Sequence, residues 1–405
     1  MKHRISALFL GTALALAAGG AMAQDKTVKI GVLTDNSGLY SDLGGAGSTL
    51  AAQMAMEDSG LAAKGWKIDI ISADHQNKPD IATTIARQWI DVEKVDIFMD
   101  VLNSGVALAV NNLVKEKNSI MINTGAATSD LTNAQCSPNT IHWVYDTYML
   151  ANSTGQALVK AGGDTWYFLT ADYAFGHALE RDTTAVVVKS GGKVIGGVKH
   201  PLNSSDFSSF LLQAQASKAK IIGMANAGGD TTNTIKQAAE FGIVAGGQKL
   251  AGLLLFITDV HSLGLKVAQG LNFTETFYWD LNDGTRAFSK RFSERMKNKA
   301  MPSMVQAGVY SGLVHYFKTI DAMGGNPHDG AKVVAKMKEL PTDDALFGQG
   351  TIRADGRKIH PAYLFEVKKP AESKGPWDYY KLIGTTPGEQ AFRPLSESAC
   401  PLVKK

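Results

Sequence analysis

The chain has 405 residues, of which 44% are hydrophobic and 20% are charged. This is enough for a substantial core and more than one typical domain needs, so we expect two lobes. The 41 basic and 38 acidic residues give a net charge of only +3 and are spread along the chain. This distribution excludes an extended basic surface, and nucleic acid is not expected as a partner.

The N-terminus has the three parts of a secretory signal peptide. A basic start, MKHR, precedes the apolar segment ISALFLGTALALAAGG, and Ala21-Met22-Ala23 has the small-x-small pattern of a cleavage site. The apolar segment is short for a membrane span and ends in small residues without a basic flank. We predict that residues 1–23 are a signal peptide and that a chain beginning near Gln24 is exported to the periplasm. No cysteine follows the cleavage point, so we expect no lipid anchor.

Segments typical of strands and helices alternate in the first third of the chain. Apolar segments predict strands at 28–34, 66–76, 95–102 and 119–125. Amphipathic segments predict helices between them, at 45–60, 80–94 and 104–118. Such continuous alternation is typical of a parallel sheet with helices on both faces.

A second alternating set follows a crossing near residues 145–148. It consists of helices at 148–163, 175–192, 206–218 and 231–243 and strands at 165–172, 193–200, 219–227 and 249–257, which predicts a second doubly wound sheet. After 271–280 the pattern changes. Two long helices, at 284–299 and 304–325, are expected to return to the first sheet. Residues 348–369 predict a β-ribbon that turns at Asp355-Gly356.

The sequence lacks the common catalytic and cofactor motifs. There is no G-x-x-x-x-G-K-[ST], G-x-G-x-x-G, G-x-S-x-G, H-E-x-x-H or C-x-x-C. The nine histidines are scattered, and no nucleophile is paired with a base. We therefore expect no catalytic residues, no cofactor and no metal, and a protein that is not an enzyme.

Three loops after predicted strands of the first lobe are rich in small hydroxyl and amide residues: 37–45, 102–107 and 123–130. Loops at the carboxyl ends of parallel strands converge where ligands dock, and each leads to a helix N-terminus with unpaired N–H groups. Ser104 and Thr128 can donate hydrogen bonds to a carboxylate. Simple helix capping is the alternative for each of them.

The segments at 30–58, 120–132, 172–182 and 307–316 resemble type I periplasmic solute-binding proteins, in particular the class that binds leucine, isoleucine and valine for ABC importers. The resemblance covers nearly the whole chain after the signal peptide. It implies an α/β fold with two doubly wound parallel-sheet lobes, joined by three crossover strands, that close on a solute. We place the first lobe at 24–145 and 279–345, the second at 146–278 and 346–392, and a tail packed on the first lobe at 393–405.

The resemblance implies that the first lobe binds a ligand carboxylate through a hydroxyl and backbone N–H groups. By position these belong to Asn103, Ser104, Ala126, Ala127 and Thr128, and the register between Ala127 and Thr128 is open by one. The remaining implied contacts are Tyr40 and Leu43 of the first lobe and Tyr173, Phe175, Asn226, Ala227, Leu253 and Leu254 of the second.

The sequence departs from the family where amino-acid-binding members carry an acidic residue that pairs with the substrate ammonium. Here an apolar run, Leu253 to Phe256, occupies that position. Burying an ammonium without a counter-charge is costly, so we expect an organic acid without an amine and favour an aromatic one. This holds unless Asp230 or Asp259 turns inward. An ordinary buried strand is the alternative for the leucine run, and whether Trp279 and Tyr310 face the cleft stays open.

The two cysteines, Cys136 and Cys400, lie beside prolines in loop-like sequence. An even count in an oxidising compartment favours a disulfide that ties the tail to the first lobe, and two unpaired thiols are the alternative.

We therefore expect a monomeric periplasmic protein that delivers a small solute to the membrane subunits of an ABC permease. An amino-acid-binding protein of the same class and a ligand-sensing receptor subunit are the alternatives.

Overall fold

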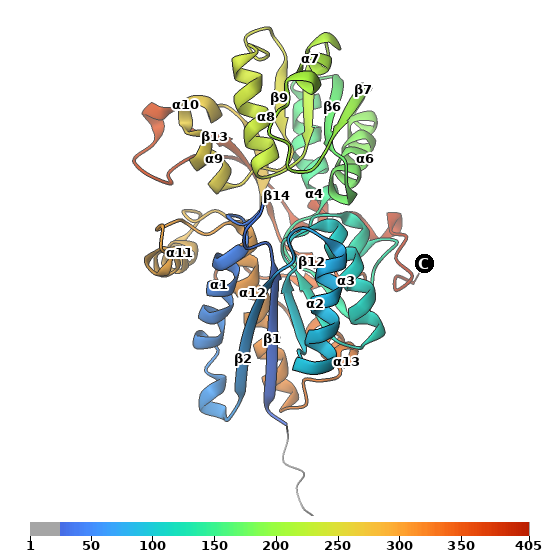
Figure 1. The fold of residues 1–405 in the computed structure, drawn as a ribbon, viewed down its shortest axis with the longest axis vertical. Coiled ribbons are helices and arrows are strands. Elements are labelled where there is room, and N and C mark those ends of the chain that lie inside the picture. Colours follow the sequence, from blue (N-terminus) through green and yellow to red (C-terminus); the bar gives the residue numbers. More distant parts are fainter. Residues whose placement is uncertain (1–24, 405) are drawn as a thin grey trace, which may run out of the picture.

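The computed structural model describes residues 25–404, so the predicted signal peptide lies outside the described residues. Two lobes lie one above the other in Figure 1, with the first lobe (blue, cyan and orange) below and the second (green and yellow) above. No helix within the described part of the chain is long and apolar enough to cross a membrane.

The first lobe is built on a parallel sheet with the strand order β2-β1-β3-β4-β5. Its strands are β1 (Thr27–Thr34), β2 (Lys67–Asp74), β3 (Ile97–Asp100), β4 (Ile120–Asn123) and β5 (Thr140–His142). Its helices are α1 (Gly45–Asp58), α2 (Pro79–Gln88), α3 (Ser104–Glu116), α11 (Asp283–Arg295), α12 (Met304–Met323) and α13 (Gly330–Glu339).

At the centre of this sheet, on β3 and β4, both faces are buried, as the apolar strands predict. On β3, Phe98 packs in a cluster with residues of α2 and α3. Its neighbours Ile97 and Met99 point to the other face and pack with residues of α1 and α12. The late helix α12 therefore returns to cover the first sheet, as predicted.

The second lobe contains a parallel sheet with the order β7-β6-β8-β9 and a separate antiparallel sheet with the order β10-β13-β14. The strands are β6 (Thr165–Ala171), β7 (Lys193–His200), β8 (Ile221–Ala225), β9 (Lys249–Gly252), β10 (Asn272–Glu275), β13 (Ala362–Val367) and β14 (Tyr380–Thr386). The helices are α4 (Thr147–Leu150), α5 (Gln156–Lys160), α6 (Ala174–Lys189), α7 (Ser208–Ala216), α8 (Gly229–Glu240), α9 (Ile257–Leu263), α10 (Leu265–Ala268) and α14 (Gly388–Ala391). The antiparallel sheet was not predicted.

Three segments cross between the lobes: 143–146 after β5, 276–282 after β10, and 360–361 between β12 (Lys358–Ile359) and β13. The two parallel sheets and these crossovers confirm the predicted fold class. The predicted helix at 148–163 forms with an interruption, because a π-helical turn at Ala151–Gly155 separates α4 from α5.

Two predictions for the later part of the chain are wrong. The ribbon predicted at 348–369 is shorter and consists of β11 (Thr351–Ile352) paired with β12. The remaining strand, β13, pairs with β10 and β14 in the antiparallel sheet. The expected turn is present, with Gly356 at a φ of 85°. Residues 346–359 lie on the first lobe rather than the second, because β11 packs against α13 and Arg357 forms a bridge with His142 of β5.

Candidate functional site

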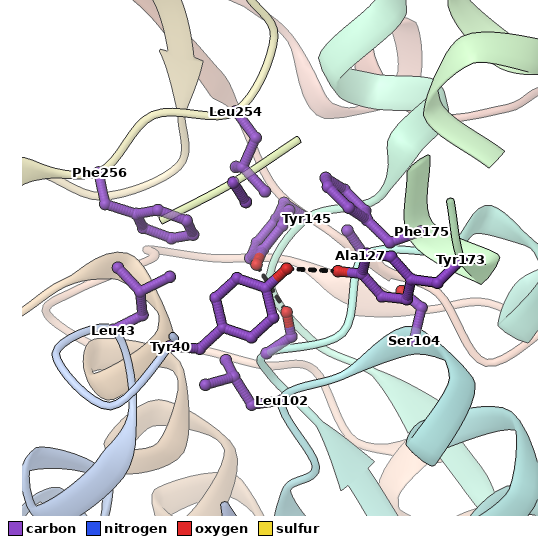
Figure 2. Close-up of a pocket in the computed structure, with 12 residues that line it drawn as sticks. Tyr40, Leu43, Leu102, Ser104, Ala127, Tyr145, Tyr173, Phe175, Leu254 and Phe256 are labelled. Atoms are coloured by element: carbon purple, nitrogen blue, oxygen red, sulfur yellow. Dashed lines mark hydrogen bonds between the residues drawn. The ribbon is translucent and has the colours of Figure 1, made fainter. Parts of the chain in front are cut away.

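A narrow cavity lies between the lobes, at the carboxyl ends of both parallel sheets. The first lobe lines it with the loops after β1, β3 and β4, and the second lobe with the loops after β6, β8 and β9. Figure 2 shows its lining residues, which are Tyr40, Leu43, Leu102, Ser104, Gly125, Ala127, Tyr145, Tyr173, Phe175, Ala227, Leu254 and Phe256.

The wall from the first lobe offers hydrogen-bond donors. Ser104 is the first residue of α3, and its Oγ accepts a hydrogen bond from the backbone N–H of Thr128 at 3.2 Å, which leaves the hydroxyl proton to donate. Within residues 25–404, the backbone N–H groups of Ser104 and Ala127 donate no hydrogen bond. Ser104 lies at the N-terminus of α3, so this wall suits an anion.

The approach to this wall requires an unusual backbone. Asp100, the last residue of β3, and Val101, which follows it, have positive φ values of 74° and 52°. The strand predicted at 95–102 therefore ends at Asp100, and the turn brings Leu102 to the cavity. Such strained residues cluster at ligand sites, because there the surrounding structure holds them in place.

Three tyrosines contribute hydroxyls to the cavity. The Tyr40 and Tyr173 hydroxyls form a hydrogen bond with an oxygen–oxygen distance of 2.6 Å. Tyr145 donates to the carbonyl oxygen of Gly125, also at 2.6 Å. Burial raises the pKa of all three hydroxyls, so they stay protonated at neutral pH.

Apart from the Tyr173 hydroxyl, the wall from the second lobe is apolar. Its members Phe175, Ala227, Leu254 and Phe256 are all buried. Phe256 also packs edge-on against Tyr145, with ring centroids 6.0 Å apart.

The apolar run 253–256 is a loop and not the end of a strand. The strand predicted at 249–257 stops at Gly252, since Leu253 donates its N–H to the carbonyl oxygen of Ala251. The loop turns Leu254 to the cavity, whereas Leu253 is fully buried elsewhere.

The two carboxylates that could pair with a ligand ammonium, those of Asp230 and Asp259, accept hydrogen bonds from backbone N–H groups of their own lobe. Asp259 accepts from the N–H of Phe256 at 2.9 Å, and burial raises its pKa to about 7. Asp230 accepts from the N–H groups of Asn203 and Ser204 at 3.1 and 2.8 Å, and burial raises its pKa to about 6. Among the described residues, no Asp or Glu lines the cavity.

The structure brings most of the predicted site residues together. The cavity is lined by Tyr40, Leu43, Ser104, Ala127, Tyr173, Phe175, Ala227 and Leu254. The register left open in the loop after β4 therefore falls on Ala127.

Five predicted contacts do not line the cavity, because backbone geometry gives their side chains other partners. Asn103 caps α3 by accepting from the N–H groups of Gly105 and Val106, and the Thr128 hydroxyl accepts from the N–H of Asp130. The N–H of Ala126 donates to the Asn123 side chain. The Asn226 side chain forms hydrogen bonds with Thr231 and Thr234. Leu253 is the fifth of these residues.

The two residues left open also lie elsewhere. The Trp279 indole donates to the carbonyl oxygen of Trp377, and the Tyr310 hydroxyl donates to Asp58. Conversely, four lining residues are not among the predicted contacts: Leu102, Gly125, Tyr145 and Phe256, the last of which belongs to the predicted apolar run. Leu102 and Gly125 are the last residues of the strands predicted at 95–102 and 119–125, which is the signal that could have identified them, whereas nothing in the sequence marks Tyr145.

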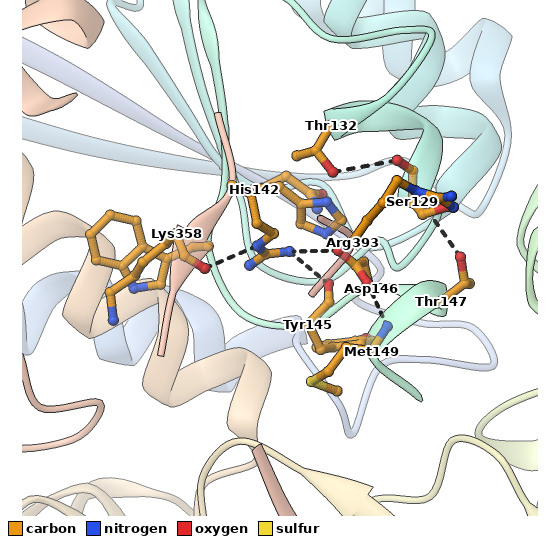
Figure 3. Close-up of polar contacts among 12 residues, drawn as sticks. Ser129, Thr132, His142, Tyr145, Asp146, Thr147, Met149, Lys358 and Arg393 are labelled. Carbon is orange, nitrogen blue, oxygen red and sulfur yellow. Dashed lines mark hydrogen bonds and ion pairs between the residues drawn. The ribbon is translucent and has the colours of Figure 1, made fainter. Parts of the chain in front are cut away.

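A buried polar network surrounds the first crossover (Figure 3). Asp146 accepts from the N–H of Met149 at 2.8 Å and pairs with Arg357 at 3.5 Å. Asp182 of α6 accepts from the hydroxyls of Ser129 and Thr147, both at 2.6 Å, and so joins the two lobes beside the crossover.

The predicted disulfide is present. Cys136 and Cys400 are joined, with their Cα atoms 5.6 Å apart. The bond ties the C-terminal tail to the first lobe, and the N–H of Ala399 donates to Asn133 beside it.

Comparison with known proteins gives a consistent result. The family model described as "Periplasmic binding protein" matches residues 27–375. A solved periplasmic binding protein from Burkholderia mallei is 52% identical, with a TM-score of 0.90 over 94% of this chain and all of that one. A branched-chain amino acid ABC transporter periplasmic ligand-binding protein from Burkholderia xenovorans LB400 is 42% identical, with a TM-score of 0.82 over 93% of this chain and all of that one.

More distant proteins are also similar to this chain, one in sequence and one in structure. "Leu/Ile/Val-binding protein homolog 6" of Brucella abortus (strain 2308) is 26% identical over 88% of this chain and 92% of its own length. A solute-binding protein from Rhodopseudomonas palustris, solved in complex with benzoate, is 22% identical, with a TM-score of 0.79 over 93% of this chain and 99% of that one.

Proposed function

We propose that this chain, which belongs to the periplasmic binding protein family, binds an organic carboxylate without an amino group in the cavity between its lobes. It is a periplasmic protein of an ABC transporter, so its partners are a small solute and the membrane subunits of a permease. In this proposal it acts as a monomer and catalyses no reaction. Its role is to capture the solute and carry it to the permease.

The observation that carries this proposal is the difference in polarity across the cavity. Ser104 and the N–H of Ala127 suit a carboxylate on one side, and Leu254 and Phe256 suit an apolar body on the other. An ammonium would be buried beside those two residues without a counter-charge, at a cost of several kcal/mol.

An aromatic body fits this lining well. Phe175, Phe256 and three tyrosines surround the space, and aromatic rings pack favourably edge to face. The relative from Rhodopseudomonas palustris was solved with benzoate, which supports the view that this fold accommodates an aromatic acid.

Matched ligand pairs test the proposal directly. We would titrate the purified protein calorimetrically with 4-methylpentanoate and leucine, which differ by the amino group, and with 3-phenylpropanoate and phenylalanine. Benzoate and the neutral benzamide would test the charge. We expect each acid to bind more tightly than its amino counterpart, and benzoate more tightly than benzamide.

The alternative is an amino-acid ligand, which the name of the 42% identical relative favours. Tighter binding of leucine or phenylalanine than of its des-amino partner would overturn our proposal and support this one. A thermal-shift series would provide an independent readout, since a ligand that binds the folded state raises the melting temperature.

A further inference from the structure

The hydrogen bond between the Tyr40 and Tyr173 hydroxyls joins the two lobes across the cavity (Figure 2). Tyr40 lies in the loop between β1 and α1 of the first lobe, and Tyr173 directly precedes α6 of the second. This hydrogen bond can exist only while the lobes are close together.

The first partner is held firmly by its own lobe. The buried carboxylate of Asp35 accepts from the N–H of Tyr40 at 2.9 Å, from the N–H of Gly38 at 2.7 Å and from the side-chain amide of Asn77 at 2.6 Å. Tyr40 is only 3% exposed. Its hydroxyl is therefore carried by a fixed loop and moves with the first lobe.

The second partner is equally fixed to its own lobe. The N–H of Tyr173 donates to the carbonyl oxygen of Ala171 at 2.8 Å, and its carbonyl oxygen accepts from the N–H of His177 in α6 at 3.1 Å. Its ring packs against Phe175, with centroids 5.9 Å apart.

The backbones of the two lobes also meet beside this pair. A Cβ atom on Gly228, in the loop after β8, would lie 2.9 Å from the carbonyl oxygen of Leu39 and 3.0 Å from Cδ1 of Tyr40. A Cβ on Gly229 would lie 2.6 Å from a methyl carbon of Leu39. The closed arrangement therefore has no spare room at this point.

We propose that Tyr40 and Tyr173 form an interlobe latch, which stabilises the closed arrangement and so adds to the affinity for the solute. Tyr40 is buried and Tyr173 is partly buried, and each hydroxyl finds its partner in the other lobe, so separating the lobes breaks the bond. Affinity depends on the population of the binding-competent arrangement, so a contact that favours closure raises it. This inference rests on the proposed function only in assigning the closed cavity to a solute.

The first test measures closure without any solute. Gln53 of α1 and Ser262 of α9 are exposed and lie on opposite lobes around a groove at the mouth between them. Spin labels on Q53C and S262C report the interlobe distance by pulsed electron resonance, and the two native cysteines are paired and do not react. Short distances report the closed arrangement. We expect Tyr40→Phe or Tyr173→Phe to lower the ratio of short to long distances by about fivefold, as the loss of one hydrogen bond predicts.

The double variant Y40F/Y173F adds a stricter test. Each single variant leaves one hydroxyl without its partner, whereas the double variant removes both. Its effect should therefore be no larger than that of either single variant. Tyr316→Phe is the matched control, because Tyr316 is fully buried in the first lobe and its hydroxyl has no partner among the described residues.

An unchanged distance distribution in both single variants would overturn the latch, as would single effects that simply multiply in the double variant. The second test titrates benzoate into the same variants, where we expect each single variant to bind about fivefold more weakly. If benzoate does not bind but the distances shift, the latch stands and the proposed ligand class fails. If the distances stay unchanged and benzoate binds normally, the latch fails and the proposed ligand class stands.

Discussion

The two walls of the interlobe cavity are built from the same kind of element and differ in chemistry. In both lobes a parallel strand ends in a loop that leads to a helix, yet the first lobe offers donors and the second offers apolar side chains. The difference lies in the first turns of the helices. Those of α1 and α3 contain no acidic residue, whereas α8 and α9 contain Asp230 and Asp259.

These acidic residues complement the positive ends of their own helices and bind neighbouring backbone N–H groups. The potential anion sites of α8 and α9 are therefore used internally, whereas α6 has no acidic residue in its first turn. On the first lobe, the N-terminus of α3 remains available to a ligand. The same architecture thus provides one polar and one apolar wall, and the residues of the loops determine the polarity of each wall.

The largest effect on this contrast between the walls is expected from a charge placed on the apolar one. Leu254→Asp should weaken benzoate binding by about 100-fold or more, because two like charges would share a buried space of low dielectric constant. Isothermal titration measures the change. Leu254→Asn, which has nearly the same shape without the charge, is the control and should lose much less. Equal losses in the two variants would mean that shape rather than charge matters here.

The polar wall can be weakened by a single hydroxyl. Ser104→Ala should reduce benzoate affinity about tenfold or slightly more, as expected for a hydrogen bond to a charged group. The neighbouring Thr128→Val removes a hydroxyl that does not line the cavity, so its affinity should change less than twofold. The same titration compares the two. A larger effect at Thr128 than at Ser104 would contradict the register that the structure assigns to this loop.

The smallest expected effect concerns the protonation of Asp259. Burial raises its pKa from 3.8 to about 7, so between these pH values the folded protein keeps a proton that the unfolded chain releases. The contribution of this carboxyl group to stability is therefore present below about pH 4 and is lost as the pH rises to about 7.

Asp259→Asn removes this titration. The free energy of unfolding of the parent minus that of the variant should fall from pH 4 to pH 7 and then level off, as measured by urea denaturation. A difference that stays constant with pH would indicate a normally ionised carboxylate, and hence a charge near the apolar wall that could pair with an ammonium.

Much of this architecture could be predicted because it depends on local patterns. Apolar segments such as 28–34 and amphipathic segments such as 104–118 form their elements almost where the periodicity places them. The disulfide followed from cysteine count and compartment. The antiparallel sheet of the second lobe could not be predicted, because β10 pairs with β13, which lies some 90 residues away in sequence.

Within the cavity, the order of residues along the chain is enough to specify which loops meet, since strand ends of a parallel sheet lie at one edge. It also specifies that the second wall is apolar, because Leu253 to Phe256 carry no charge. Which side chains of each loop face the solute is settled only when the chain is folded. That choice depends on single backbone turns, such as the positive φ values at Asp100 and Val101, and on partners from distant segments, such as Gly125 for Tyr145 and Tyr173 for Tyr40.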